Sequence, residues 1–198
     1  MKFRTLTVSA GLLAGALVLA GCGDTTAGSS DMEGMDHSSS ATADASDATF
    51  NDADVSFAMG MAMHHQQAIE MSDTLLAKDD VDAEVAALTE DIKAAQTPEI
   101  ETMNQWLETW GQDTGMGGMD HSDGMMSEED MTALEEADGE TASTLFLEQM
   151  IVHHEGAIDM AQTELNEGEN PDALALAQKI VDDQEAEIAQ MEDMLTQR

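Results

Sequence analysis

The sequence predicts an all-α protein, an antiparallel four-helix bundle made of two repeated helical hairpins. Between residues 52 and 197 the strong helix formers alanine, leucine, methionine, glutamate and glutamine predominate. Apolar residues recur there at intervals of three and four, as on one face of a helix, rather than alternating as in a strand. Two stretches of this region also repeat each other at an offset of 89 residues. Two similar hairpins pack most simply in antiparallel fashion around one shared core.

The ends of the expected helices carry capping signals. Ser127 and Asp130 have the spacing of a capping box, which satisfies the free amides of a first helical turn. Asn170 followed by Pro171 favours the start of the last helix, and Gly168 can close the helix before it. Together with the apolar spacing, these signals predict helices over 52–77, 81–109, 128–167 and 171–197.

Two residues oppose uninterrupted helices. Pro98 has no amide hydrogen to donate, so we expect it to kink the second helix or to restart it after Thr97. Gly139 lowers the helix propensity of the third segment, which we expect to divide into a short piece and a long one. Neither residue changes the expected number of long helices.

Residues 1–21 have the pattern of a signal peptide. Lys2 and Arg4 precede an uncharged apolar run that has about the length of a signal segment and is short for a membrane span. The run ends in Leu-Ala-Gly-Cys22, which resembles the lipobox of bacterial lipoproteins. The resemblance implies cleavage before Cys22, a lipid on its sulfur and anchoring to the membrane outside the cytoplasm. An ordinary secretory signal is the alternative. Cys22 is the only cysteine, which excludes an internal disulfide and any multi-cysteine metal site.

Two segments are too polar to form a core. Residues 22–50 contain mostly Ser, Asp, Ala, Thr and Gly, so they cannot bury enough surface to offset the entropy lost on ordering. We expect a disordered tether there, followed by the bundle over 51–198. The segment 111–126 is rich in methionine and glycine, and we expect it to be a flexible linker between the hairpins.

The charge of the chain restricts its partners. It has 42 acidic and 6 basic residues, for a formal net charge of −36 at pH 7. This charge repels nucleic acids and anionic lipid headgroups, so neither is an expected partner. Cations are the natural counter-species, which makes metal ions the candidate ligands.

Each half of the bundle contains a histidine pair and, further on, a glutamine and a glutamate. The first pattern is Phe57-x3-Met61-x2-His64-His65-x2-Ala68-Ile69-x-Met71, and it recurs as Phe146-x3-Met150-x2-His153-His154-x2-Ala157-Ile158-x-Met160. The second pattern is Gln96-x-x-Glu99-Ile100-x-x-Met103, and it recurs as Gln184-x-x-Glu187-Ile188-x-x-Met191.

These doubled motifs resemble the DUF305 family, whose members are secreted or lipid-anchored bacterial proteins with a ferritin-like four-helix fold. The resemblance covers about 50–110 and 127–198. Some members of the family are linked to extracytoplasmic copper binding. For this chain the resemblance implies the metal ligands Met61, His64, His65, Met71, Met150, His153, His154 and Met160.

The residue types around the histidines indicate a soft metal. Residues three apart share a helix face, so Met61 lies beside His64 and Met150 beside His153. Di-iron bundles have a glutamate at that spacing, whereas thioether with imidazole suits copper, above all Cu(I). If the halves pack about a pseudo-twofold axis, the histidine pairs face each other across the core. Possible carboxylate ligands or acceptors that orient the rings are Glu70, Glu155 and Asp159.

A structural interpretation competes with the metal site. Methionines at helical spacing usually fill a core, and this role is preferred for Met71, Met103, Met160, Met191 and Met194. The histidines could belong to an internal hydrogen-bonded network with Gln66, Gln67, Glu70 or Glu155. Burying four imidazoles without partners is costly, which favours a functional role for the two pairs.

A second repeat, Met-x-Gly-Met-Asp-His-Ser, lies outside the helices. It occurs once in the tether and once in the linker, where packing cannot account for its methionines. Compositional drift is the alternative explanation. The soft-ligand argument makes both copies candidate copper-capturing motifs, with the residues Met32, Met35, His37, Met116, Met119 and His121.

The sequence therefore favours a lipid-anchored copper-binding protein that sequesters the ion and needs no turnover. A metal-dependent redox enzyme of ferritin-like fold is a second hypothesis, although no nucleophile with its base and no cofactor motif is present in the sequence. A structural envelope lipoprotein without a metal is the third.

Overall fold

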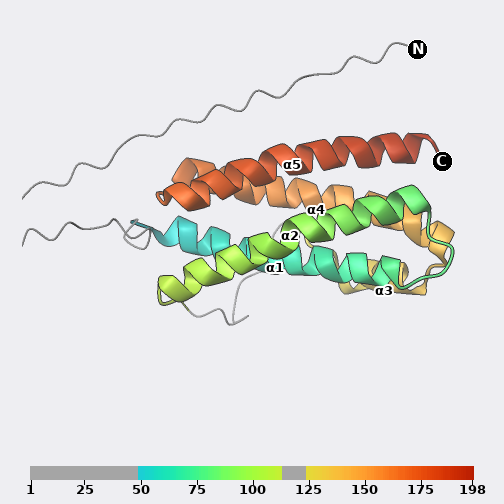
Figure 1. Cartoon of the computed structure of the whole chain (residues 1–198), viewed down its shortest axis with the longest axis horizontal. Coiled ribbons are helices and arrows are strands. Elements are labelled where there is room, and N and C mark those ends of the chain that lie inside the picture. The colour runs from blue at the N-terminus through green and yellow to red at the C-terminus, as the bar shows by residue number, and fades with distance from the viewer. Residues whose placement is uncertain (1–48, 113–123) are drawn as a thin grey trace, which may run out of the picture. The chain divides into compact units, whose positions relative to one another are not determined.

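The computed structural model describes residues 49–112 and 124–198, and this part is all-helical (Figure 1). Its elements are α1 (Asp52–Leu76), α2 (Ala83–Thr109), α3 (Glu128–Glu136), α4 (Gly139–Glu167) and α5 (Pro171–Thr196). None of the described helices is long and apolar enough to cross a membrane. Outside the described residues lie the signal peptide 1–21, the predicted lipidation site Cys22, nearly all of the tether and most of the linker 111–126. The proposed ligands of the external repeat, which are Met32, Met35, His37, Met116, Met119 and His121, lie there too.

Side-chain caps fix where the helices begin, as the sequence predicts. The Ser127 side chain accepts from the amide of Asp130, and the Asp130 carboxylate accepts from the Ser127 amide, so the capping box is confirmed. The Asn170 side chain caps α5, whose first residue is Pro171. Asn51 forms a further capping box at the start of α1.

Of the two expected interruptions, the one at Gly139 is confirmed. The third segment divides into α3 and α4, and Asp138 caps α4 through the amide of Thr141. Gly139 also allows a close backbone approach, because a Cβ on it would lie 2.0 Å from the carbonyl oxygen of Asp79. The restart after Thr97 is wrong, since α2 is continuous through Pro98.

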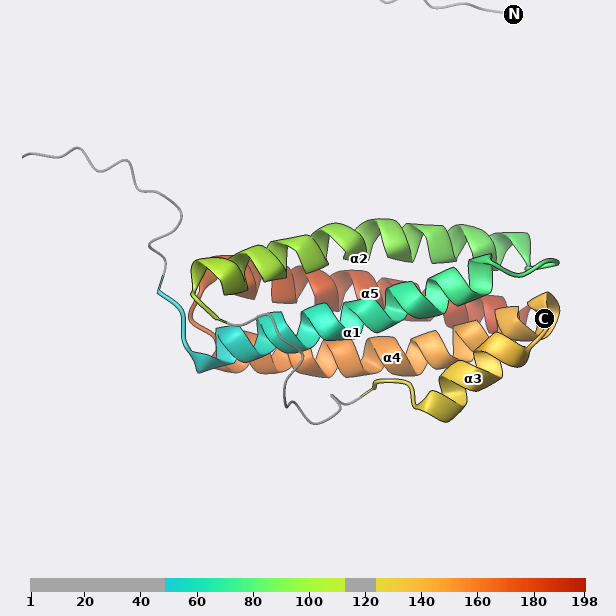
Figure 2. The same cartoon turned by 90° about the horizontal axis from the view of Figure 1, so that it is seen from below.

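Two hairpins pack side by side to form the bundle. The α1/α2 hairpin and the α4/α5 hairpin meet where α1 lies against α4 (Figures 1 and 2). These two helices are antiparallel, because Asp54 near the start of α1 accepts from the amide of Asn170, just beyond the end of α4. The short α3 packs against both α1 and α4.

The core consists of two apolar clusters with a polar layer between them. One cluster includes Phe57 and Met61 of α1, and the other includes Met71 and Leu75 of the same helix. On each long helix, polar residues occupy the positions between the two clusters. This polar layer comprises His64 and His65 of α1, Gln96 and Glu99 of α2, His153 and His154 of α4, and Gln184 and Glu187 of α5. The two repeated motifs therefore come together at mid-bundle.

Candidate metal centre

The two histidine pairs meet across the α1–α4 contact. The rings of His64 and His153 lie with their centroids 3.7 Å apart at an interplanar angle of 42°. All four imidazoles of the two pairs are buried, with at most 1% exposure. The sequence-based expectation that the pairs face each other is therefore met in the folded chain.

The second histidine of each pair is bonded to a glutamate from the neighbouring helix of its own hairpin. His65 Nε2 lies 2.8 Å from Glu99 Oε2, and His154 Nε2 lies 2.6 Å from Glu187 Oε2. Each glutamate belongs to the repeated Gln-x-x-Glu pattern. The bundle thus contains two copies of one histidine–glutamate pair, which are related by its pseudo-twofold symmetry.

The carboxylates of Glu99 and Glu187 determine which ring nitrogen of His65 and His154 carries the hydrogen. A carboxylate accepts, so a neutral imidazole paired with it carries its hydrogen on Nε2 and keeps a lone pair on Nδ1. Within residues 49–112 and 124–198, the buried Nδ1 atoms of His65 and His154 have no hydrogen-bond partner. A histidine held by a carboxylate with its other nitrogen available is the usual form of a metal-ligating imidazole.

Burial favours the neutral form of one imidazole in each pair. It lowers the pKa of His65, although the bonded Glu99 opposes the change. It also lowers the pKa of His153 well below its ordinary value, and the nearby His64 and His154 lower that pKa further. Neutral imidazole is the form that binds metal ions.

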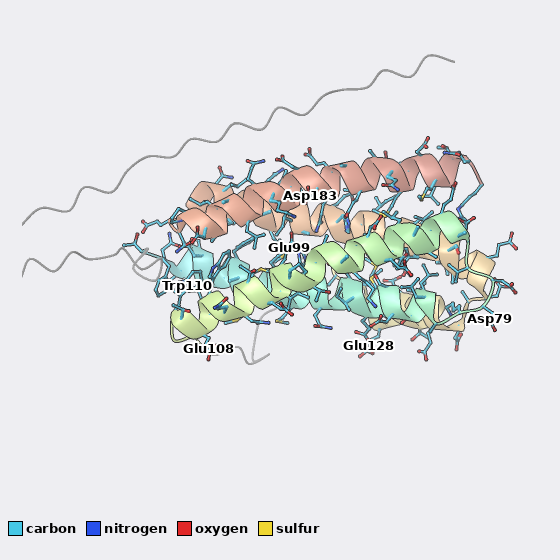
Figure 3. All side chains as sticks on the ribbon, in the orientation of Figure 1. Asp79, Glu99, Glu108, Trp110, Glu128 and Asp183 are labelled. Carbon is cyan, nitrogen blue, oxygen red and sulfur yellow. The ribbon has the colours of Figure 1, made fainter. Side chains whose placement is uncertain are left out.

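Glu99 is further held by a cation from the other hairpin. Lys179 Nζ lies 2.9 Å from Glu99 Oε1 and 2.6 Å from Asp183 Oδ2. Since Lys179 and Asp183 belong to α5, the lysine links α5 to Glu99 of α2; Figure 3 labels Glu99 and Asp183. Burial alone would raise the pKa of Glu99, but the hydrogen bonds from His65 and Lys179 outweigh burial and lower it. Glu99 is therefore ionised.

The predicted thioether ligands lie on both sides of the polar layer. Met61 and Met150 are fully buried and belong to different apolar clusters, so one lies on each side of the histidines. Met71 is also fully buried in the second cluster, and Met160 is partly buried against the first. These last two positions agree with the core role preferred for them.

The predicted carboxylate partners are wrong. Glu70, Glu155 and Asp159 are exposed on the bundle surface, and the histidines are bonded to Glu99 and Glu187 instead. Of the predicted glutamine partners, Gln66 is exposed, and Gln67 bonds to the backbone of Met126. The signal that identifies the true partners is the Gln-x-x-Glu pattern, which repeats together with the histidine pairs.

The donor set fits a soft ion better than a hard one. Across the described ranges, no three His, Cys, Asp or Glu side chains are arranged to hold a metal ion as they stand, so the four imidazoles must reorient before they can ligate one ion together. A di-iron bundle has a glutamate three residues before its histidine, where this chain has Met61 and Met150. Cu(I) instead binds nitrogen and thioether sulfur, and both are present in and beside the layer.

Several solved structures resemble this chain. A DUF305 protein from Streptomyces coelicolor, provisionally described as secreted, is 34% identical, with a TM-score of 0.67 over 73% of this chain and 93% of that one. A DUF305 fragment from Deinococcus radiodurans is 32% identical, with a TM-score of 0.69 over 76% of this chain and 99% of the fragment. CopM in its Cu(II)-bound form is 33% identical, with a TM-score of 0.63 over 73% of this chain and 96% of CopM.

The family pattern described as a domain of unknown function, DUF305, matches residues 54–195. No curated protein matches the chain. The matched range contains nearly all of the four long helices and both histidine pairs. The chain therefore belongs to the DUF305 family.

Proposed function

We propose that this protein is an extracytoplasmic, lipid-anchored copper-binding protein that sequesters the ion without transforming it. The main support for the proposal is that the buried Nδ1 atoms of His65 and His154 have no hydrogen-bond partner in the described part of the chain. Leaving such atoms unsatisfied in a core is costly, and a ligated metal ion removes that cost.

The surroundings of the polar layer support a soft ion as the cargo. Glu99 and Glu187 orient the rings, and the thioethers of Met61 and Met150 flank them. Support also comes from CopM, whose structures include Cu(I)-bound, Cu(II)-bound and Ag-bound forms. The proposed ligands are His64, His65, His153 and His154 with Met61 and Met150.

The first 22 residues are the basis for the proposed localisation. The signal segment ending at Cys22 would send the chain out of the cytoplasm and attach it to the membrane through a lipid. A mass spectrum of the N-terminal peptide should show a diacylglycerol on Cys22. An unmodified peptide that includes Cys22 would remove the lipid anchor from the proposal without affecting the metal centre.

Anaerobic titration with Cu(I) against a chromogenic chelator tests the buried site. The informative variant is the double substitution H65Q/H154Q. A glutamine amide can still donate to the glutamate, but it supplies no imidazole Nδ1, so the hydrogen-bonded pairs are preserved and the ligands are lost. We expect Cu(I) binding at this site to weaken by at least about tenfold.

A matched control removes two imidazoles from outside the bundle. The double variant H37N/H121N alters both copies of the external motif and leaves the polar layer intact. It should retain the tight Cu(I) site. Unchanged affinity in folded H65Q/H154Q protein, or an equal loss in the control, would exclude the buried site. The redox-enzyme alternative would gain support only from oxygen consumption by the copper-loaded protein.

A further inference from the structure

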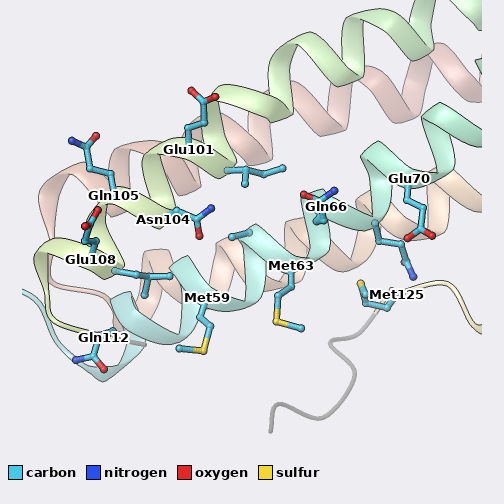
Figure 4. Close-up of a pocket in the computed structure, with 14 residues that line it drawn as sticks. Met59, Met63, Gln66, Glu70, Glu101, Asn104, Gln105, Glu108, Gln112 and Met125 are labelled. Atoms are coloured by element: carbon cyan, nitrogen blue, oxygen red, sulfur yellow. The ribbon is translucent and has the colours of Figure 1, made fainter. Parts of the chain in front are cut away.

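A groove containing methionines lies on the surface of the α1/α2 hairpin, and none of the buried residues of the polar layer lines it. It has a volume of about 1110 Å³, and three methionines line it, namely Met59, Met63 and Met125 (Figure 4). All three side chains are partly exposed. Met63 and Met125 belong to neither apolar cluster, so core packing does not account for them.

The first two methionines are one helical turn apart on α1. Residues four apart share a helix face, and Figure 4 shows the side chains of Met59 and Met63 leaving the same side of the helix. The repeat does not explain them, because the equivalent positions in the second half are Glu148 and Val152. This pair of thioethers is therefore particular to the first half.

The third methionine is brought to the groove by a fixed piece of backbone. Gln67 donates to the carbonyl oxygen of Met126 at 2.9 Å and accepts from its amide at 2.7 Å. Gly124 has a φ of 85° and packs so closely that a Cβ on it would lie 2.6 Å from Gly156 Cα. These contacts hold the backbone on both sides of Met125 against α1 and α4.

The rim of the groove is polar and acidic. Glu70, Glu101 and Glu108 line it together with amide side chains. Carboxylates at the rim raise the local concentration of cations, whereas the thioethers select soft ions among them. Partly exposed methionines beside such a rim are suited to taking up an ion.

We propose that Met59, Met63 and Met125 form a surface site for a soft monovalent metal ion, Cu(I) or Ag(I). The site is distinct from the buried histidine layer and does not depend on it. Thioether sulfur binds these ions without deprotonation, so the three methionines can hold one at any physiological pH. Ag(I) is the practical probe because it has the same ligand preference and needs no reductant.

The test counts bound Ag(I) and follows the methionine methyl groups by NMR. Protein labelled with ¹³C at the methionine methyls should show shifts at Met59, Met63 and Met125, with each signal assigned from its leucine variant. The double variant M63L/M125L keeps the apolar volume and removes two sulfurs, so it should bind one Ag(I) fewer than the unmodified protein. The matched control is M131L/M194L, which alters two partly buried methionines packed against the second cluster.

The design separates this site from the buried one. H65Q/H154Q protein should still show the three methyl shifts, and M63L/M125L protein should keep the tight site that H65Q/H154Q loses. If Ag(I) moves none of the three methyl signals, or if M63L/M125L binds as many ions as M131L/M194L, the surface site does not exist. Circular dichroism of both variants verifies that the bundle is folded.

Discussion

The two halves of the bundle hold the same histidine–glutamate pair in different electrostatic surroundings. In the first half, Glu99 accepts from both His65 and Lys179, and its side chain is 10% exposed. In the second half, Glu187 pairs with His154 and is 19% exposed. The position equivalent to Lys179 is Asp91, which is exposed and cannot donate. The repeat has thus kept the pair and changed the charge beside it.

Comparing the two halves shows which interactions are needed to orient the imidazoles. Both glutamates orient an imidazole, so the orientation is common to the two halves. The cation is present once, so it is not needed to hold a ring in place. Lys179, which lies on α5 and is half exposed, instead links that helix to α2 through the buried carboxylate of Glu99.

Removing the two glutamates one at a time should give the largest effect. Glu99→Ala removes the acceptor of His65 and one of the two acceptors of Lys179, which keeps Asp183, and we expect it to lower the free energy of unfolding by about 2 to 3 kcal/mol. Glu187→Ala removes the acceptor of His154 alone, so we expect it to lower the free energy of unfolding by only about 1 to 2 kcal/mol. Urea denaturation followed by circular dichroism measures both. Equal losses would show that Lys179 adds nothing to the first pair.

The two ends of the α1–α4 contact provide a second comparison. At one end the buried carboxyls of Asp54 and Glu164 interact, whereas the repeat has Ser143 and Leu75 at the equivalent positions of the other end. Burial and the neighbouring Asp54 raise the pKa of Glu164 to about 8. Asp54 stays ionised because burial, which would raise its pKa, is outweighed by amide donors from Asn51 and Asn170, which lower it.

Substituting Glu164 should therefore change how stability depends on pH. A carboxyl whose pKa is raised on folding stabilises the protein fully below its unfolded pKa of 4.5, and that contribution is lost as the pH rises through about 8. Glu164→Gln removes the titration, so above pH 8 we expect it to be more stable than the parent by about 2 kcal/mol. Thermal unfolding between pH 5 and pH 9 tests this. Glu167→Gln makes the same substitution at an exposed position of the same last turn and serves as the control.

The sequence predicts the helices and the meeting of the histidine pairs because both follow from local periodicity and from the repeat. The predicted restart of the helix at Pro98 is wrong because tertiary packing outweighs the local effect of the proline. Gln96 and Glu99 on either side of it are buried, so packing of α2 into the core outweighs the loss of one backbone hydrogen bond. Local propensity contains no information about that packing.

The partners of His65 and His154 were missed for a related reason. Spacing along one helix led to Glu70 and Glu155, whereas the true partners come from the neighbouring helix of each hairpin. Which residues meet between helices depends on how the helices are aligned, and intrahelical spacing does not determine that. Only the co-occurrence of the His-His and Gln-x-x-Glu patterns in both halves reveals the pairing.

The smallest expected effect comes from giving the second half the cation that it lacks. Asp91→Lys places an ammonium at the position equivalent to Lys179, where the repeat predicts that it can reach Glu187. Because the new pair is partly exposed, we expect a gain of about 0.5 kcal/mol in the free energy of unfolding. Part of any gain comes simply from reducing the net charge of −36. Glu90→Lys makes the same charge change one residue away, so only a gain beyond that control, lost again in 0.5 M NaCl, supports the pairing.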